Sequence, residues 1–277
     1  MPLTIPYFEL PNLGFVEPWG LLVATGTIVG VLWAVRRARQ KGLDVERLKD
    51  LAAWGVVGGF VGARLGHVFF YHWWYYQDHL TEIPQLWLGG MSSIGGFTGA
   101  TIMGLIAIRR YKINVWRYGD VAAFCTIFGW AIGRIGCALI HDHPGQVSDF
   151  FLAVEMDVSN FLSQKELVAL YQETQGTIQA RHDLGLYDSL LSFAITGLFL
   201  FWDRRPRFPG FYLGWFCILY FLPRFFLDYL RATDVGQWSD TRYLQLTPAQ
   251  YGSIMLVMVG GWILWRQRNK SCEEHTT

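Results

Sequence analysis

Charged residues are scarce in this sequence of 277 residues. Asp, Glu, Lys and Arg make up 16% of it, whereas an ordinary soluble domain contains roughly 25%. Hydrophobic residues account for 52% of the chain and aromatic residues for 17%. This composition excludes disordered, collagen-like and low-complexity chains, and it disfavours a soluble enzyme. We therefore expect an integral membrane protein.

Other features are also absent. The four cysteines show no Cys-x-x-Cys spacing, so neither a disulfide framework nor a zinc site is predicted. The net charge is only +1, which does not favour binding to nucleic acid. The first apolar stretch is preceded by Glu17 and by no Lys or Arg, so it lacks the basic region of a cleavable signal peptide. We expect no metal, no cofactor and no nucleic-acid partner.

Long apolar stretches occur seven times along the chain. A bilayer core about 30 Å thick requires about 20 mostly apolar residues per helix. The stretches are residues 19–35, 51–71, 88–108, 119–140, 185–202, 209–229 and 248–265. They predict an all-α integral membrane protein with about seven transmembrane helices, in which residues 1–277 form a single polytopic domain. The Gly- and Ser-rich run 89–96 is typical of a re-entrant or broken element that lines a cavity.

Basic residues gather in alternate connectors between these stretches. Of the 23 Lys and Arg residues, 16 lie in four segments, which are 36–49, 109–117, 204–207 and 266–270. The positive-inside rule makes these segments cytoplasmic, with the N-terminus outside and the C-terminus in the cytoplasm. The polar segment 141–184 is then a small external cap, and the aromatic cluster 71–76 fits an interfacial belt.

Three arginines, Arg64, Arg134 and Arg224, fall inside predicted spans. A charge at the bilayer centre costs about 2.5 to 3.5 kcal/mol on insertion scales, so each arginine requires a partner or a polar cavity. Each lies 13 to 15 residues along a helix of the same direction, so the three share one depth. This arrangement predicts a pocket for the phosphate of a lipid head group. The alternative is a structural salt bridge, for which Asp228 lies one turn after Arg224.

Glycines recur at four-residue spacing near these arginines. They are Gly58, Gly62 and Gly66, then Gly95 and Gly99, then Gly129 and Gly133. Small residues at this spacing predict close contact between membrane helices.

Five motifs together resemble the prolipoprotein diacylglyceryl transferases, in the same order and spacing over nearly the whole chain. They are Gly62-Ala63-Arg64-Leu65-Gly66 followed by Phe69-Phe70-Tyr71, the run 89–96, Gly133-Arg134-Ile135-Gly136, Arg181-His182 followed by Leu186-Tyr187-Asp188, and Tyr220, Arg224, Asp228 and Arg231 at their spacing. Family membership implies a multi-pass protein of the bacterial inner membrane.

The resemblance also implies a reaction. Such enzymes transfer the diacylglyceryl group of phosphatidylglycerol to the thiol of a lipobox cysteine in a prolipoprotein, which forms a thioether and releases glycerol phosphate. The expected partners are thus phosphatidylglycerol, membrane lipid and the lipobox of a prolipoprotein signal peptide. The residues expected to bind substrate are Arg64, Arg134, Gly136, Tyr220, Arg224 and Arg231.

The proton acceptor departs from the family pattern. Where the family has a histidine before a Gly-Gly pair in the third span, this chain has Ile94, which cannot accept a proton. His141 and His143 follow Arg134 by about two turns at the outer end of its span, and His67 lies one turn from Arg64. We expect His141 or His143 to act as the base, with Asp142 in the place of the family's outer-loop glutamate.

Two other functions compete with this interpretation. One is a related phospholipid-dependent transferase with another acceptor, and the other is a non-catalytic membrane protein that binds anionic lipid. A transporter is disfavoured because the sequence shows no internal repeat.

Overall fold

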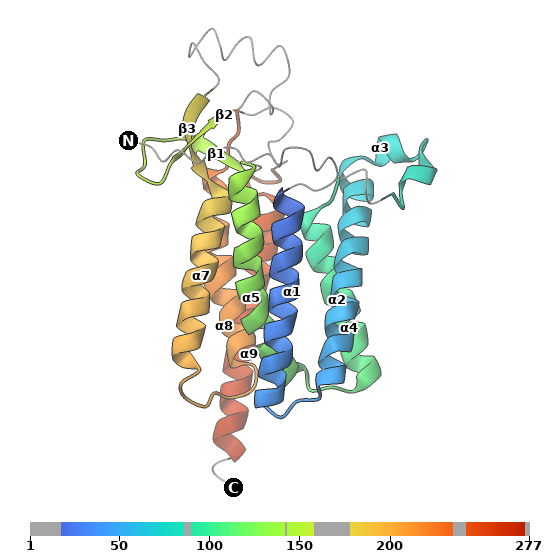
Figure 1. Cartoon of the computed structure of the whole chain (residues 1–277), viewed down its shortest axis with the longest axis vertical. Coiled ribbons are helices and arrows are strands. Elements are labelled where there is room, and N and C mark those ends of the chain that lie inside the picture. The colour runs from blue at the N-terminus through green and yellow to red at the C-terminus, as the bar shows by residue number, and fades with distance from the viewer. Residues whose placement is uncertain (1–17, 86–89, 142, 158–177, 235–241, 275–277) are drawn as a thin grey trace. The chain divides into compact units, whose positions relative to one another are not determined.

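The chain is mostly helical in a computed structural model, which describes residues 18–85, 90–141, 143–157, 178–234 and 242–274 (Figure 1). The long helices are α1 (Pro18–Gln40), α2 (Val45–Gly66), α4 (Ser93–Tyr111), α5 (Val115–Leu139), α7 (Leu184–Trp202), α8 (Phe211–Leu227) and α9 (Pro248–Glu274). Short helical segments are η1 (His67–Tyr71), α3 (Trp73–Tyr76), η2 (Leu80–Glu82) and η5 (Asp228–Leu230).

Two compact units make up the structure, and each is described by itself. One contains the described residues of Met1–Gly30 and Ala122–Thr277, and the other is Val31–Val121. Helices α1 and α5 contribute residues to both units.

In the first unit, a three-stranded antiparallel sheet adjoins the bundle of α5, α7 and α8. Its strands are β1 (Pro144–Val147), β2 (Val154–Asp157) and β3 (Ile178–Asp183), in the order β1-β3-β2. The central strand β3 continues directly into α7 (Figure 1). Asp183 caps this helix because its Oδ1 accepts a hydrogen bond from the Leu186 backbone N–H at 2.8 Å. All three strands fall within the segment 141–184.

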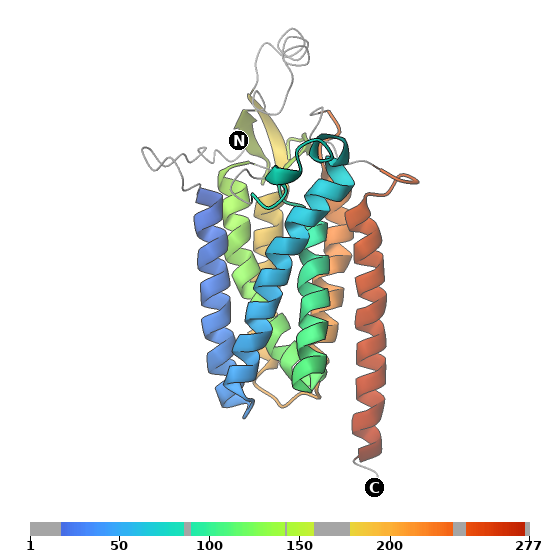
Figure 2. The ribbon, with the colours of Figure 1, turned by 90° about the vertical axis from the view of Figure 1, so that its right-hand side faces the viewer.

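Helix α9 is a single uninterrupted helix of 27 residues (Figure 2). It packs against α8 through Gly214 and Gly260, where an added Cβ would come within 2.8 Å of a neighbouring atom. The same kind of contact joins α1 to α5, because a Cβ at Gly26 would lie 2.3 Å from the Gly129 carbonyl oxygen.

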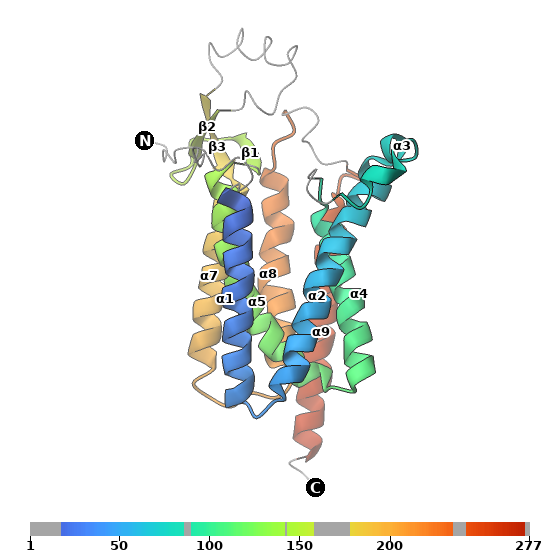
Figure 3. The same cartoon turned by 45° about the vertical axis from the view of Figure 1, so that its right-hand side comes forward.

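In the second unit, α2 and α4 lie side by side (Figure 3). A Cβ at Gly62 would lie 2.4 Å from the Gly95 carbonyl oxygen, and a Cβ at Gly99 would lie 2.2 Å from that of Gly58. The two backbones therefore touch with no side chain between them, which confirms the predicted role of the glycines at four-residue spacing.

The run 89–96 is partly helical. Gly89 lies outside the described residues, but Ser92 caps α4 by accepting a hydrogen bond from the Gly95 N–H at 3.2 Å. Residues from Ser93 onward form a regular helix of 19 residues, so the expectation of a re-entrant or broken element is wrong for 93–96.

Within the described residues, five helices are long and apolar enough to cross a membrane. They are Trp19–Gln40, Val45–Phe70, Val115–Leu139, Leu184–Trp202 and Phe211–Leu230. These five coincide with five of the predicted stretches. The remaining two predicted stretches, near 88–108 and 248–265, correspond to α4 and α9, which are helical but are not among the five. The structure thus supports a mostly helical, multi-pass membrane protein, to which the small sheet within 141–184 is the exception.

The glycine contact yields a prediction about stability. Replacing Gly62 with Ala forces α2 and α4 apart, and overpacking of this kind costs about 1 to 3 kcal/mol. We expect a Tm several degrees lower for the purified protein in detergent.

Gly55 on the same helix supplies the control, because nothing lies within 4 Å of the position its Cβ would take. Gly55→Ala should leave the Tm unchanged or raise it, since alanine is the better helix former. Equal Tm values for Gly62→Ala and Gly55→Ala would contradict the contact.

Candidate functional site

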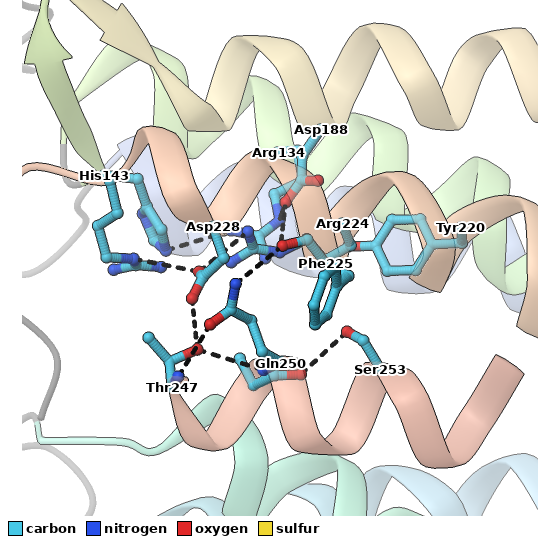
Figure 4. A network of polar contacts seen from close by, with 12 residues as sticks. Arg134, His143, Asp188, Tyr220, Arg224, Phe225, Asp228, Thr247, Gln250 and Ser253 are labelled. Carbon is cyan, nitrogen blue, oxygen red and sulfur yellow. Dashed lines mark hydrogen bonds and ion pairs between the residues drawn. The ribbon is translucent and has the colours of Figure 1, made fainter. Parts of the chain in front are cut away.

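A buried carboxylate bridges two of the arginines that the sequence singles out. Asp188, near the start of α7, places its Oδ2 3.4 Å from Nε of Arg134 on α5 and 3.4 Å from Nε of Arg224 on α8. The Asp188 side chain is 1% exposed, and the arginine side chains are 9% and 10% exposed. Three helices therefore meet at one carboxylate (Figure 4).

Arg224 has a second acidic neighbour in Asp228. Its Nη1 lies 3.3 Å from Asp228 Oδ1, as the spacing of four residues predicts. The angles at Arg224 Nη1 do not allow a hydrogen bond to Asp228. Neither oxygen of Asp188 accepts a hydrogen bond from the described residues. The carboxylates thus compensate the charge of Arg224 without engaging its N–H groups in well-aligned hydrogen bonds.

Asp228 is also held by Arg231 and by Thr247, the residue that precedes α9. Its Oδ1 accepts a hydrogen bond from Arg231 Nε at 3.3 Å, and its Oδ2 accepts one from the Thr247 hydroxyl. Gln250 completes this arrangement: its amide oxygen accepts from the Thr247 N–H at 2.9 Å, and its amide nitrogen donates to the Phe225 carbonyl at 3.1 Å (Figure 4). The end of α8 and the start of α9 are thereby tied together.

The two histidines expected to act as a base occupy different positions. His143 Nε2 lies 3.3 Å from Arg134 Nη1. Because a guanidinium group can only donate, this nitrogen accepts and Nδ1 carries the ring proton. His141, which is 4% exposed, places Nδ1 3.4 Å from Asp183 Oδ2. A carboxylate beside Nδ1 favours the tautomer whose basic nitrogen is Nε2. Asp142 lies outside the described residues.

Tyr220 and Gly136 also belong to this unit. Tyr220 is buried, and its hydroxyl accepts a hydrogen bond from Trp130 Nε1 at 2.7 Å. The Trp130 ring in turn lies 4.7 Å from the Arg134 guanidinium carbon, which is a cation–π contact. Gly136 faces α1, where a Cβ would lie 3.1 Å from Trp19 Cα, so its contact in the structure is between helices.

Arg64 belongs to the other unit. Its Nε donates to the Ile83 carbonyl at 2.8 Å and its Nη2 to the Glu82 carbonyl at 2.7 Å. Its guanidinium carbon lies 5.2 Å from the centre of the Tyr76 ring. Arg64 therefore ties the end of η2 and the residue after it to the end of α2, and its role in binding substrate stays a prediction.

Sequence reasoning missed Asp188 as a partner of the arginines. The only signal was its position in the Leu186-Tyr187-Asp188 motif, because 54 residues separate it from Arg134 and no helical periodicity connects the two. Thr247 and Gln250 were missed for the same reason, since their contacts cross from one helix to another. The fold thus gives Arg134 an acidic partner that the sequence analysis did not identify.

These arginines and aspartates form one cluster, called the arginine cluster below, whose charges suit a bound anion. Three arginines, Arg134, Arg224 and Arg231, face two aspartates, so these five side chains carry one net positive charge. All five side chains are at most 15% exposed. In such a water-poor site a single negative charge is bound more strongly than at an exposed surface.

Known proteins resemble this chain over most of its length. The sequence profile of the prolipoprotein diacylglyceryl transferase family matches residues 7–266. A phosphatidylglycerol–prolipoprotein diacylglyceryl transferase of Thermosynechococcus vestitus is 32% identical over 275 residues, which cover 95% of this chain and 94% of the relative.

Two similar relatives come from other bacteria. The transferase of the same name from Staphylococcus xylosus is 31% identical over 97% of this chain and 92% of its own length. That of Geobacillus kaustophilus is 30% identical over 90% of this chain and 88% of its own length. The match extends over the helices that carry Arg134, Asp188 and Arg224, and the chain belongs to the prolipoprotein diacylglyceryl transferase family.

Proposed function

We propose that the chain transfers the diacylglyceryl group of phosphatidylglycerol to the thiol of a lipobox cysteine in prolipoproteins. The centre of the buried cluster, where Asp188 lies between Arg134 and Arg224, carries this proposal. The names of the relatives supply the donor and the acceptor. The cluster supplies the positive charge that binding of a phosphodiester requires.

The phosphate of the donor binds between Arg134 and Arg224. Their contacts with Asp188 at 3.4 Å are longer than the 2.7 to 2.9 Å that is usual for charged hydrogen bonds. A phosphate can therefore compete for the guanidinium N–H groups. Arg231 and Tyr220 lie at the edge of the same cluster.

An apolar cavity in the first unit suits an acyl chain. Its volume is about 210 Å³, and it lies between α8 and α9, lined by Leu222, Phe225, Phe226, Ser253, Ile254, Val257 and Met258. Several of these residues flank Arg224 and Asp228 in sequence. A phosphate at the arginines and an apolar chain in this cavity match the two parts of one phospholipid.

The reaction forms a bond from the cysteine sulfur to a glyceryl carbon and breaks the bond from that carbon to a phosphate oxygen. Charge develops on the departing phosphate, and the two arginines stabilise it electrostatically. The thiol proton passes to a base, for which we propose His141 or His143. His141 is oriented by Asp183, as in a carboxylate–imidazole pair, whereas His143 contacts Arg134.

The proposal includes seven membrane crossings in the bacterial inner membrane, with the N-terminus outside and segment 141–184 as an external cap. Two of the basic connectors adjoin within the second unit, because Arg117 Nη2 donates to the Lys41 carbonyl at 3.0 Å. Basic connectors on one side are what the positive-inside rule requires.

A direct assay tests the function. Purified protein is incubated with phosphatidylglycerol and a lipobox peptide, and mass spectrometry detects a diacylglyceryl group on the peptide. Transfer to another acceptor, or retention of lipid without any transfer, would favour one of the two competing functions.

The arginine cluster yields a prediction about lipid binding. We expect Arg134→Gln and Arg224→Gln each to weaken retention of phosphatidylglycerol and to lower transfer. Lysine at either position should restore only part of it, because lysine lacks the planar fork of arginine. Arg205→Gln, in the exposed connector between α7 and α8, is the control. If both glutamine variants retain the lipid like the wild type, the arginines serve only as structural salt bridges.

The histidines yield a prediction about turnover. Loss of the base should reduce turnover by about 10² to 10⁴ with little change in lipid retention. We therefore expect one of His141→Gln and His143→Gln to show this loss. Conversion of Ile94, whose side chain lies outside the described part of the chain, to His should raise the activity. The assignment of the base fails if both histidine variants keep the wild-type turnover.

Topology is tested independently of activity. Introduced cysteines in 36–49, 109–117 and 203–208 should be protected from an impermeant reagent in intact cells, whereas cysteines in 141–184 should react. Labelling of the 109–117 connector from outside would overturn the orientation.

A further inference from the structure

Arg181 is the largest side chain that is almost completely buried among the described residues. It lies on β3, outside the arginine cluster, and is 1% exposed. Burying an unpaired guanidinium group is costly, so its partners explain why it is tolerated.

The main partner of Arg181 is Asp234. Nη1 donates to Asp234 Oδ1 at 3.0 Å and Nη2 to Oδ2 at 2.5 Å, which makes a bidentate pair. Nη1 also donates to the Gly145 carbonyl at 3.1 Å, and Nε to the Gln179 side-chain oxygen at 3.0 Å. The Arg181 hydrogen bond holds the pKa of the Asp234 carboxyl below its usual range, so the pair is ionised at neutral pH.

Asp234 ends a segment that begins at the arginine cluster. This segment, residues 229–234, follows Asp228 and contains Arg231, which donates to Asp228. Strand β1 holds its main chain: the Ala232 N–H donates to the Pro144 carbonyl at 3.1 Å, and Gly145 forms a bridge with Arg231. The segment therefore adds to the edge of the sheet, and Arg181 fastens its far end.

Strand β3, which carries Arg181, also leads to Asp188, the second carboxylate of the cluster. Two residues after Arg181, Asp183 caps α7, and five residues later Asp188 lies between Arg134 and Arg224. Strand β3 thus connects to the cluster along two routes, through α7 and through the segment 229–234.

We propose that Arg181 is a positioning residue for phospholipid binding, which acts through Asp234 to hold Arg231 and Asp228 in place. This inference rests on the proposed function. Only Arg181 is buried in this ion pair, because the Asp234 side chain is 51% exposed, and a pair of this kind is weak support for stability. A role in orienting the phosphate-binding residues explains why the pair joins β3 to the segment 229–234.

The inference makes a specific kinetic prediction. Under the proposed function, Arg231 and Asp228 belong to the cluster that holds the phosphate both before and during the reaction. Displacing them therefore weakens binding of the ground state and of the transition state alike. Such a change raises KM with little change in kcat. We expect Arg181→Gln and Asp234→Asn each to raise the KM for phosphatidylglycerol about tenfold, the loss of a charged hydrogen bond being of this order, with kcat within about twofold of wild type.

Arg181→Lys keeps the charge but not the fork, so it should restore only part of the affinity. Asp234→Asn is the second variant in case Arg181→Gln fails to fold, because the Asp234 side chain is 51% exposed and asparagine keeps its shape and one acceptor oxygen. The control is Asp203→Asn, which removes the hydrogen bond of 3.1 Å from Tyr212 at the opposite ends of α7 and α8. It should leave KM unchanged.

Hydrogen exchange supplies a readout that does not depend on activity. Peptides that contain Ala232 should exchange faster in Arg181→Gln and Asp234→Asn than in the wild type. A kcat that falls at unchanged KM would show that the variants only lose folded enzyme, which would overturn the inference. A wild-type KM in both variants would overturn it as well. If the wild type shows no transfer, the proposed function fails, while the exchange rates still decide whether Arg181 holds the segment.

Discussion

The carboxylate of Asp188 is the interaction on which the helix bundle of the first unit depends. Two guanidinium groups buried at neighbouring positions repel each other and lose their hydration. One carboxylate, 1% exposed and 3.4 Å from both, offsets part of this repulsion. Removing one partner of a buried charge pair costs about 3 to 5 kcal/mol, because the remaining charge stays buried. The crossing of α5, α7 and α8 is therefore constrained by charge as well as by packing.

Much of the fold could be predicted from apolar length and small-residue spacing. The stretches 119–140 and 185–202 match α5 and α7 closely, because long apolar runs specify helices in a membrane environment. The glycines of α2 and α4 predict their contact, because a four-residue period places them on one face. The three short strands were not predicted, since four to six residues with mixed polarity carry no clear period.

The site was predicted in part. Arg134 and Arg224 stand out because charge is rare inside apolar stretches. Asp188 lies near the start of its stretch, where an acid is unremarkable, and its role emerges only when α7 packs against α5 and α8. Arg181 lies in a polar segment, where arginine is common, and its burial depends on a sheet that joins residues far apart in sequence.

The single net positive charge of the cluster has a consequence for the end of the catalytic cycle. The phosphodiester of the donor carries one negative charge, whereas the monoester that leaves carries about −1.5 to −2 at pH 7. Under the proposed function, a site that neutralises the donor therefore attracts the product more strongly than the donor. Under the same proposal, glycerol phosphate competes with phosphatidylglycerol for the cluster, so an accumulating product inhibits transfer.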